Sequence, residues 1–211
     1  MEFFEKGTKN DILYWSKRLY QKNMSPSKSG NISLKTPDGI LISASNTCLN
    51  DMDENDVVLI DFEGNLIQGN KKPSSEKIMH SEIYTRRDDI GAIIHCHDPL
   101  ITAFAVAGKP IDKAILPDMA LKFETIPIIP YFHPSTIELA TTAADLFDKG
   151  YNAVLLKNHG IIVGSDTLQN AFYDIELIRS YVEIYFGAEV LGGASLIPKK
   201  SVEELKKIYI K

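Results

Sequence analysis

The stretch Ala92-Ile93-Ile94-His95-Cys96-His97 decides how the rest of the chain is interpreted. Its apolar residues predict a buried strand that ends in two histidines. Successive side chains of a strand point to opposite faces, so His95 and His97 share one face. This arrangement suits two imidazoles that bind one metal ion, and it turns Cys96 toward the opposite face and the core.

A third histidine, His159, lies between two apolar runs at residues 153–157 and 160–164. The runs predict two buried strands joined by a tight turn, which would hold His159 rigidly. Three neutral imidazoles bind Zn²⁺ or a similar divalent ion and leave one position open, as in catalytic sites. The alternative is that these are core histidines with hydrogen-bond partners. Spacing alone leaves both interpretations open.

Outside these stretches, periodicity and turn residues predict further helices and strands. The expected helices cover residues 11–22, 76–87 and 98–107, and the expected strands cover 31–34, 39–43, 57–61, 65–68 and 126–129, the last at a sheet edge. Three more helices are expected to begin at Ser135, Asp166 and Ser201, the first and last in capping boxes with Glu138 and Glu204. This order predicts a mixed α/β fold whose central sheet is mostly antiparallel and carries helices on its faces.

Composition limits the class of protein. The chain has 211 residues, which suits a single domain over residues 1–211. A net charge of −5 without a basic stripe argues against a nucleic-acid binder. The two cysteines form no disulfide framework, so reduced thiols are expected. The N-terminal sequence has no long apolar run, which predicts neither a signal peptide nor a membrane span and therefore a cytoplasmic protein.

Three polar loops are candidate ligand-binding segments. Ser74, Ser75 and Glu76 open a predicted helix, and its free N–H groups and hydroxyls could bind a phosphate beside a carboxylate base. Serine and glutamate are equally typical of an ordinary helix start. Residues 29–31 and 45–47 likewise either donate hydrogen bonds to a ligand or supply left-handed turn geometry.

Five stretches, in the same order, resemble the class II aldolase and adducin head family, and within it the L-fuculose-1-phosphate aldolases. They are Ser29-Gly30-Asn31-Ile32-Ser33, Leu41-Ile42-Ser43-Ala44-Ser45-Asn46, Lys72-Pro73-Ser74-Ser75-Glu76, Ile94-His95-Cys96-His97 and Leu156-Lys157-Asn158-His159-Gly160. The resemblance implies a three-layer α/β/α fold and a homotetramer with active sites between subunits. It also implies a divalent metal, usually zinc, with Mn²⁺ or Co²⁺ as alternatives.

The resemblance also implies roles for individual residues. By matching position, His95, His97 and His159 bind the metal. Glu76 is the catalytic acid and base and can ligate the resting metal. The implied phosphate pocket consists of Gly30, Asn31, Ser45, Asn46, Ser74 and Ser75. The family's usual Thr-Gly is replaced here by Ser45-Asn46, which keeps a hydroxyl and tolerates left-handed backbone.

One departure concerns the proton donor. The bacterial L-fuculose-phosphate aldolases have a tyrosine where this chain has Leu116-Pro117-Asp118. Asp118 or Glu124 is a candidate replacement. Tyr209 lies about as far from the C-terminus as a second family tyrosine, which enters the site of a neighbouring subunit.

The function implied by this resemblance is that of a lyase of carbohydrate metabolism, which cleaves a phosphorylated sugar. It splits a ketose 1-phosphate into dihydroxyacetone phosphate and a small aldehyde such as lactaldehyde. Alternatives on the same scaffold are a pentulose-5-phosphate 4-epimerase, a methylthioribulose-1-phosphate dehydratase and a phosphosugar-acid decarboxylase. The epimerases' Thr-His-Ala-Asp stretch is missing here. A non-catalytic, adducin-like interaction module is the alternative of another class, and the intact histidines and Glu76 argue against it.

Overall fold

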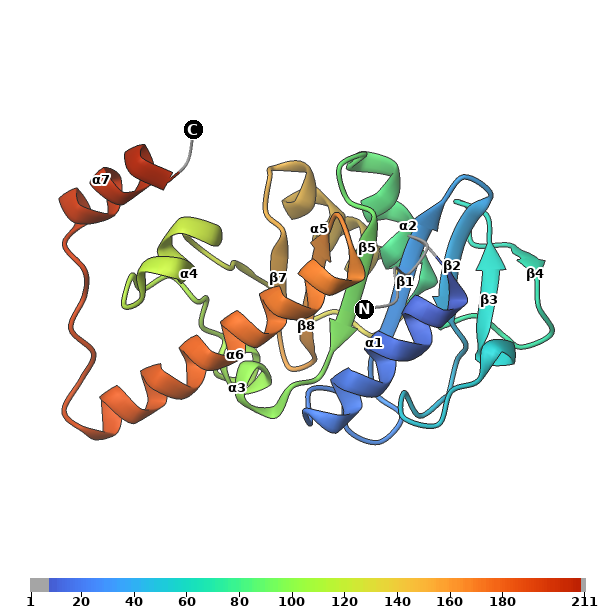
Figure 1. Cartoon of the computed structure of the whole chain (residues 1–211), viewed down its shortest axis with the longest axis horizontal. Helices are drawn as coiled ribbons and strands as arrows, with labels where there is room; N and C mark the ends of the chain where they lie inside the picture. Colours follow the sequence, from blue (N-terminus) through green and yellow to red (C-terminus); the bar gives the residue numbers. More distant parts are fainter. Residues whose placement is uncertain (1–7, 210–211) are drawn as a thin grey trace.

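A computed structural model describes residues 8–209, which form an α/β fold around one eight-stranded sheet (Figure 1). The strands are β1 Asn31–Thr36, β2 Gly39–Ser43, β3 Val57–Ile60, β4 Leu66–Gln68, β5 Ala92–Cys96, β6 Ile128–Ile129, β7 Ala153–Leu156 and β8 Gly160–Ser165. Their order is β4-β3-β2-β1-β5-β8-β7-β6, and every neighbouring pair is antiparallel except β6 with β7. The predicted, mostly antiparallel mixed sheet is therefore confirmed.

Helices cover both faces of the sheet. The helices of the described residues are α1 Lys9–Gln21, α2 Lys77–Arg86, α3 Pro99–Ala107, α4 Pro117–Lys122, α5 Ile137–Asp148, α6 Leu168–Val190 and α7 Lys199–Tyr209, with a 3₁₀ turn η1 at Glu54–Asp56. Of these, α7 packs against α4 and not against the sheet. Alternate residues of β5 separate the two layers. Ile94 and Cys96 pack with α1, α3 and α6, whereas Ile93 packs with α2 and α5. The fold thus has three layers, α/β/α, and Cys96 lies in the core as expected.

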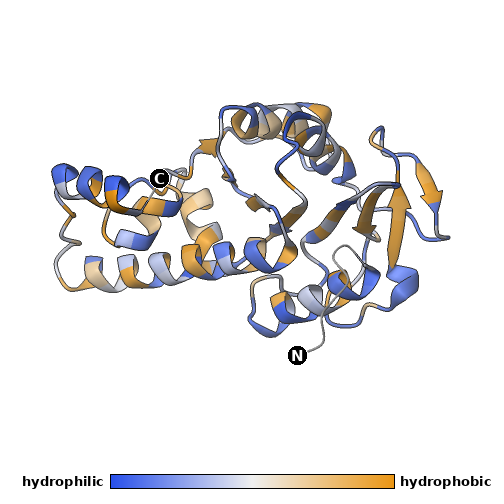
Figure 2. Cartoon of the chain, turned by 45° about the horizontal axis from the view of Figure 1, so that its top comes forward, coloured by the Kyte–Doolittle hydropathy of each residue, from blue (hydrophilic) through white to orange (hydrophobic). Residues whose placement is uncertain are grey.

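The polarity of the elements follows this layering. Figure 2 shows hydrophobic residues concentrated in the strands, and hydrophilic and hydrophobic residues alternating along the long helix α6 and along α7. Because a helix that covers a core buries only one stripe, this alternation fits α6, whereas α7 buries no residue and packs against α4. Within residues 8–209, no helix combines the length and the apolar character needed to cross a bilayer. Cys48 and Cys96 are both free thiols.

Two predicted helix starts are wrong by one residue. Helix α5 is capped by Thr136, whose hydroxyl accepts from the Leu139 N–H, and not by Ser135. Ser135 has φ = 67°, whereas an N-cap residue adopts extended backbone. Helix α6 is capped by Thr167 instead of Asp166, whose carboxylate accepts from the Asn170 side chain. Adjacent residues that can both cap are distinguished by backbone geometry, which the sequence does not display.

The C-terminal part differs more from expectation. Helix α7 begins at Lys199, so the expected capping box at Ser201 is wrong, and the Ser201 N–H donates to the Pro198 carbonyl within the first turn. Helix α4 was not anticipated, and Pro117 occupies its first turn, where a missing N–H is tolerated. The expected strand over residues 126–129 is only Ile128–Ile129, and it does lie at the sheet edge.

Candidate metal centre

Three of the chain's five histidines come together where β5 ends and β7 turns into β8. His95 lies in β5, opposite Asn31 of β1 and Ile162 of β8. His97 directly follows β5, and His159 lies in the turn, where Asn158 has φ = 57°. The ring centroids of these three histidines are 4.8 to 4.9 Å apart, and one nitrogen of each lies within 4.8 Å of the others. The residues that the sequence indicated therefore form one cluster.

Glu76 completes this cluster from the opposite side. It occupies the position before α2, but its side chain makes no capping hydrogen bond. Its carboxylate points instead at the histidines, with Oε2 3.0 Å from His95 Nε2 and Oε1 3.5 Å from His159 Nε2. The residue is only 7% exposed. An ordinary helix-start role does not account for a buried carboxylate in this position.

The hydrogen-bond partners of His95 show that the cluster suits a cation. His95 Nδ1 lies 2.9 Å from the Ile161 carbonyl oxygen, which can only accept, so Nδ1 carries a proton. In neutral His95 the Nε2 lone pair then faces the Glu76 carboxylate, and it also lies 2.9 Å from His97 Nε2. The His95 Nε2 lone pair and the carboxylate oxygen would repel each other, so a proton or a metal ion must lie between them. A histidine whose second nitrogen donates to a backbone carbonyl is also the usual support for a metal ligand.

The protonation states fit the same interpretation. Burial and the nearby charge of His95 lower the pKa of His97 to about 3 and that of His159 to about 4. Burial opposes charge on His95 and on Glu76 as well, but their mutual attraction outweighs it. The pKa of His95 is therefore raised, and the pKa of Glu76 falls well below its usual range. His97 and His159 are thus neutral at neutral pH, which is the form that binds metal.

Once a cation takes the place of the proton between His95 and Glu76, three neutral imidazoles and a carboxylate form a suitable donor set for a divalent ion such as Zn²⁺. Glu76 Oε1 and His159 Nδ1 are buried and make no hydrogen bond among the residues that the structure describes. The unbonded carboxylate oxygen remains available to a cation or to a substrate proton. Two observations therefore indicate that a divalent ion fits this cluster: the types of ligand present, and the Glu76 oxygen that has no hydrogen-bond partner.

A chain of buried polar residues extends from Glu76 away from the histidines. Asn31 Nδ2 donates to Glu76 Oε2 at 3.1 Å, and Asn31 Oδ1 lies 2.5 Å from His80 Nε2. His80 Nδ1 lies 2.6 Å from Ser33 Oγ, which lies 2.8 Å from the Tyr84 hydroxyl. His80, Ser33 and Tyr84 were not expected at the site from the sequence. The available signal was the four-residue spacing of Glu76, His80 and Tyr84, which places them on one helix face.

The loops expected to bind phosphate lie next to one another. An isolated bridge joins Ala44 to Pro73, and the Ser45 N–H donates to the Lys72 carbonyl. Ser74 is buried, and its hydroxyl accepts from the Glu76 N–H at 3.3 Å, whereas Ser75 and Asn46 are exposed.

Two of these loop positions have the left-handed backbone that the sequence indicated. Asn46 has φ = 62° and Gly30 has φ = 77°. A Cβ on Gly30 would lie 2.7 Å from the His95 carbonyl oxygen, so only glycine fits beside the histidine strand.

The three candidate proton donors lie elsewhere in the chain. Asp118 is exposed on α4, and Glu124 forms an ion pair with Lys206 of α7 at 2.7 Å. Tyr209 is 70% exposed on α7, which packs against α4. Both helices lie at the end of the molecule remote from α2 and β1 (Figure 1). Within one subunit, the structure therefore does not bring these side chains to the histidines.

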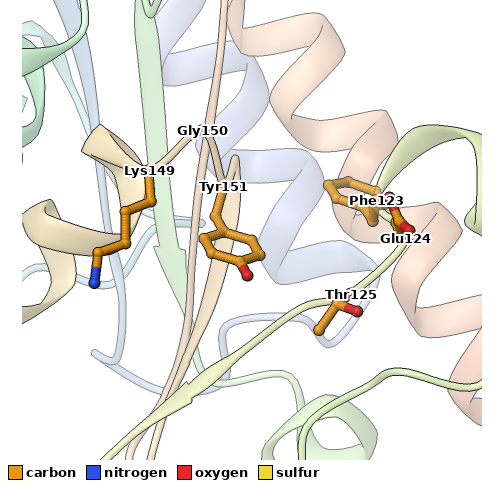
Figure 3. A pocket seen from close by; sticks show the side chains of 6 residues that line it. All are labelled: Phe123, Glu124, Thr125, Lys149, Gly150 and Tyr151. Carbon is orange, nitrogen blue, oxygen red and sulfur yellow. The ribbon is translucent and has the colours of Figure 1, made fainter.

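An open depression of about 410 Å³ lies near this end of the molecule (Figure 3). Its walls come from the segment after α4 and from the turn between α5 and β7. It is lined by Phe123, Glu124, Thr125, Lys149, Gly150 and Tyr151. None of these is a histidine of the cluster or a residue of the phosphate-binding loops, so the depression is separate from the candidate site.

The chain is similar to a known family of proteins in both sequence and structure. The family model described as Class II Aldolase and Adducin N-terminal domain matches residues 10–186. A 5-deoxy-D-ribulose 1-phosphate aldolase of Bacillus thuringiensis is 31% identical over 204 residues, covering 95% of this chain and 94% of the relative. An L-fuculose phosphate aldolase of Methanococcus maripaludis is 29% identical over 174 residues, covering 82% and 93%. A solved structure of L-fuculose 1-phosphate aldolase superposes with a TM-score of 0.86 at 30% identity and covers 95% of each chain.

Proposed function

The chain belongs to the family of class II aldolase and adducin N-terminal domains and is an aldolase-type lyase, and on this premise we propose that it cleaves a ketose 1-phosphate. The products are dihydroxyacetone phosphate and a small aldehyde. The observation that carries the proposal is the buried Glu76 carboxylate, which lies between His95 and His159 and keeps one oxygen unbonded. A carboxylate placed beside a metal site can move a proton at a carbon next to a carbonyl.

In this proposal His95, His97 and His159 hold a divalent ion, with Zn²⁺ preferred and Mn²⁺ or Co²⁺ as alternatives. When bound, the ion acts as a Lewis acid that stabilises negative charge developing on the substrate oxygens. Glu76 is also a candidate ligand of the resting metal, because its oxygens point at the same nitrogens.

The protein's own groups then perform the remaining steps. Gly30, Asn31, Ser45, Asn46, Ser74 and Ser75 anchor the phosphate through hydroxyl, amide and backbone donors. The C4 hydroxyl loses its proton, the C3–C4 bond breaks, and C4 leaves as the aldehyde carbon. Glu76 takes up one proton from solvent, in balance with the proton that the C4 hydroxyl releases, and delivers it to C3, which completes dihydroxyacetone phosphate.

The substrate class follows from chemistry shared with the relatives. Both named sugars are 1-phosphates of deoxy ketoses, so cleavage between C3 and C4 releases dihydroxyacetone phosphate from either. The five-carbon sugar leaves acetaldehyde, and the six-carbon sugar leaves lactaldehyde. We propose that this chain accepts a substrate of this class, with a small aldehyde that ends in a methyl group.

The proposed assembly is a homotetramer in which a neighbouring copy completes each site. Asp118 and Tyr209 are the candidate groups that take the proton from the C4 hydroxyl and return it in the reverse reaction, because both are exposed on helices far from their own subunit's histidines. We also propose that the enzyme is cytoplasmic, in keeping with its two free thiols.

The proposal is tested with metal-loaded protein, by following release of dihydroxyacetone phosphate from 5-deoxyribulose 1-phosphate and from L-fuculose 1-phosphate. We expect Glu76→Gln to lower kcat by about 10² to 10⁴, because general acid–base catalysis supplies about that factor. Wild-type cleavage by Glu76→Gln would contradict the assigned role.

Other outcomes of the same assay identify the alternatives. Conversion of a pentulose 5-phosphate without release of fragments would indicate the epimerase, and loss of water or of carbon dioxide would indicate the dehydratase or the decarboxylase. Purified protein that contains no divalent ion and turns over none of these sugars would indicate the adducin-like module.

A further inference from the structure

The buried side chains of Asn31 and His80 form a row of hydrogen bonds that begins at Glu76. In each of these hydrogen bonds the donor and the acceptor can be assigned. The Glu76 carboxylate can only accept, so Asn31 presents its NH₂ group to it and its carbonyl oxygen to His80. His80 must then carry its proton on Nε2. Its Nδ1 is left as an acceptor for the Ser33 hydroxyl. The chain is therefore self-consistent with one neutral tautomer of His80.

Two elements hold this chain in place. Asn31 and Ser33 are two residues apart in β1 and share one face of the sheet, and His80 and Tyr84 lie one turn apart on α2. His80, Ser33 and Tyr84 are fully buried, and Asn31 is 5% exposed. Burial lowers the pKa of His80 to about 3, in keeping with a neutral ring. A flipped Asn31 amide would set oxygen against the carboxylate and NH₂ against an N–H, which makes two repulsive contacts between buried groups.

We propose that His80 is a positioning residue: by donating from Nε2 to the Asn31 carbonyl, it locks the Asn31 amide in the orientation that aims the Glu76 carboxylate at the reacting carbon. This proposal rests on the proposed role of Glu76 in proton transfer. His80 itself touches neither the three histidines of the cluster nor the Glu76 side chain in the contacts described. Its effect should therefore appear in kcat, because a small misplacement of a catalytic group slows the reaction strongly.

A matched pair of variants separates this role from simple packing. In His80→Gln the side-chain amide reaches the place of Nε2 and can still donate to Asn31, whereas in His80→Asn it reaches only the place of Nδ1. We expect His80→Gln to keep kcat within about threefold of wild type and His80→Asn to lose about 10- to 100-fold, with KM changed less than about threefold in both. Metal content should be equal in all three proteins.

Two results would overturn the proposal. One is an equal loss of kcat in both variants at equal thermal stability. The other is a rise in KM that matches the fall in kcat, because it would place His80 in substrate binding. If His80→Asn does not fold, Ser33→Ala replaces it: removal of the donor to Nδ1 leaves the His80 ring less firmly held and should reduce kcat.

A spectroscopic measurement tests the inference independently of catalysis. Nitrogen-15 chemical shifts of the His80 ring should report the neutral Nε2–H tautomer at pH 7, and the Asn31 side-chain NH₂ should exchange slowly. His80→Gln should preserve slow exchange, and His80→Asn should abolish it. A protonated ring or an Nδ1–H tautomer contradicts the inference. If the shifts agree but no ketose phosphate is cleaved, the proposed function fails while the hydrogen-bond assignment stands.

Discussion

His80 is one of the buried histidines that should make the protein less stable in acid. In the folded chain, burial lowers the pKa of His80 to about 3, whereas the unfolded side chain titrates near its ordinary 6.5. Between these values the unfolded state binds a proton that the folded state does not, so stability falls as the pH falls. The contribution of neutral His80 is complete above about pH 7 and is lost progressively toward pH 3.

This effect can be isolated by comparing the wild type with His80→Gln, which has no group to titrate at that position. With the metal removed by a chelator, the wild type should lose about 1.4 kcal/mol per pH unit more than the variant between about pH 6 and 4. Urea denaturation at several pH values measures both free energies of unfolding. A difference that stays constant with pH would show that His80 does not resist protonation.

At the scale of elements, the start of α3 couples helix capping to the histidine strand. Asp98 directly follows His97, and its Oδ1 accepts from the N–H groups of Leu100 and Ile101, each at 2.9 Å. Its Oδ2 lies 3.4 Å from Arg179 Nη1 of α6. Burial raises the pKa of the Asp98 carboxyl, although the capping N–H groups and Arg179 oppose this. The cap therefore fixes where the chain leaves β5, and with it the position of His97.

Asp98→Ala should destabilise the protein by about 1–2 kcal/mol through loss of the cap, and it should weaken metal binding because His97 is less well held. Asp98→Asn keeps an oxygen for the two N–H groups and is the matched control, with a smaller loss. Chemical denaturation gives the stability, and titration with Zn²⁺ against a competing chelator gives the affinity. Unchanged affinity in Asp98→Ala would mean that His97 is positioned by β5 alone.

Many of the strands, helices and turns could be predicted from the sequence because their residue patterns are distinct. Strands such as β5 and β8 are short apolar runs between polar residues, and the turn at Asn158 and His159 is marked by its residue types. The clustering of His95, His97, His159 and Glu76 could be expected because strand spacing and the family resemblance pointed to the same positions. The starts of α5 and α6 were missed by one residue because neighbouring side chains can both cap. The role of His80 was missed because it depends on Asn31, 49 residues away in the sequence.

At the scale of the whole molecule, the remote position of α7 bears on how the site is completed. No residue of α7 is buried, and Tyr209 is exposed beyond the long helix α6. In the proposed tetramer, this end of one copy reaches the histidines of the next. If each site is shared between two copies, two variants that each lack a different site residue can complement each other in a mixed oligomer.

Mixing two inactive variants tests that consequence. Glu76→Gln and Tyr209→Phe should each be impaired alone, but oligomers reassembled from both should recover activity above either parent, because some sites combine an intact Glu76 with an intact Tyr209 from a neighbour. The control is Glu76→Gln protein that is dissociated and reassembled with itself. It should recover no activity, because none of its sites has an intact Glu76. Absence of recovery in oligomers that are shown to be mixed would place both residues in the same subunit's site, or Tyr209 outside it.

The sheet register at His95 also governs how the site forms in time. His95 pairs with β1 on one side and β8 on the other, and its Nδ1 partner, Ile161, is 66 residues away along the chain. Hairpins such as β1–β2 and β7–β8 close short loops and can form early in folding, whereas the pairings that build the site close long loops. The candidate metal-binding residues are therefore expected to come together after the local hairpins have formed. An ion bound there would join segments that are distant in the sequence, so we expect it to slow unfolding of the native state.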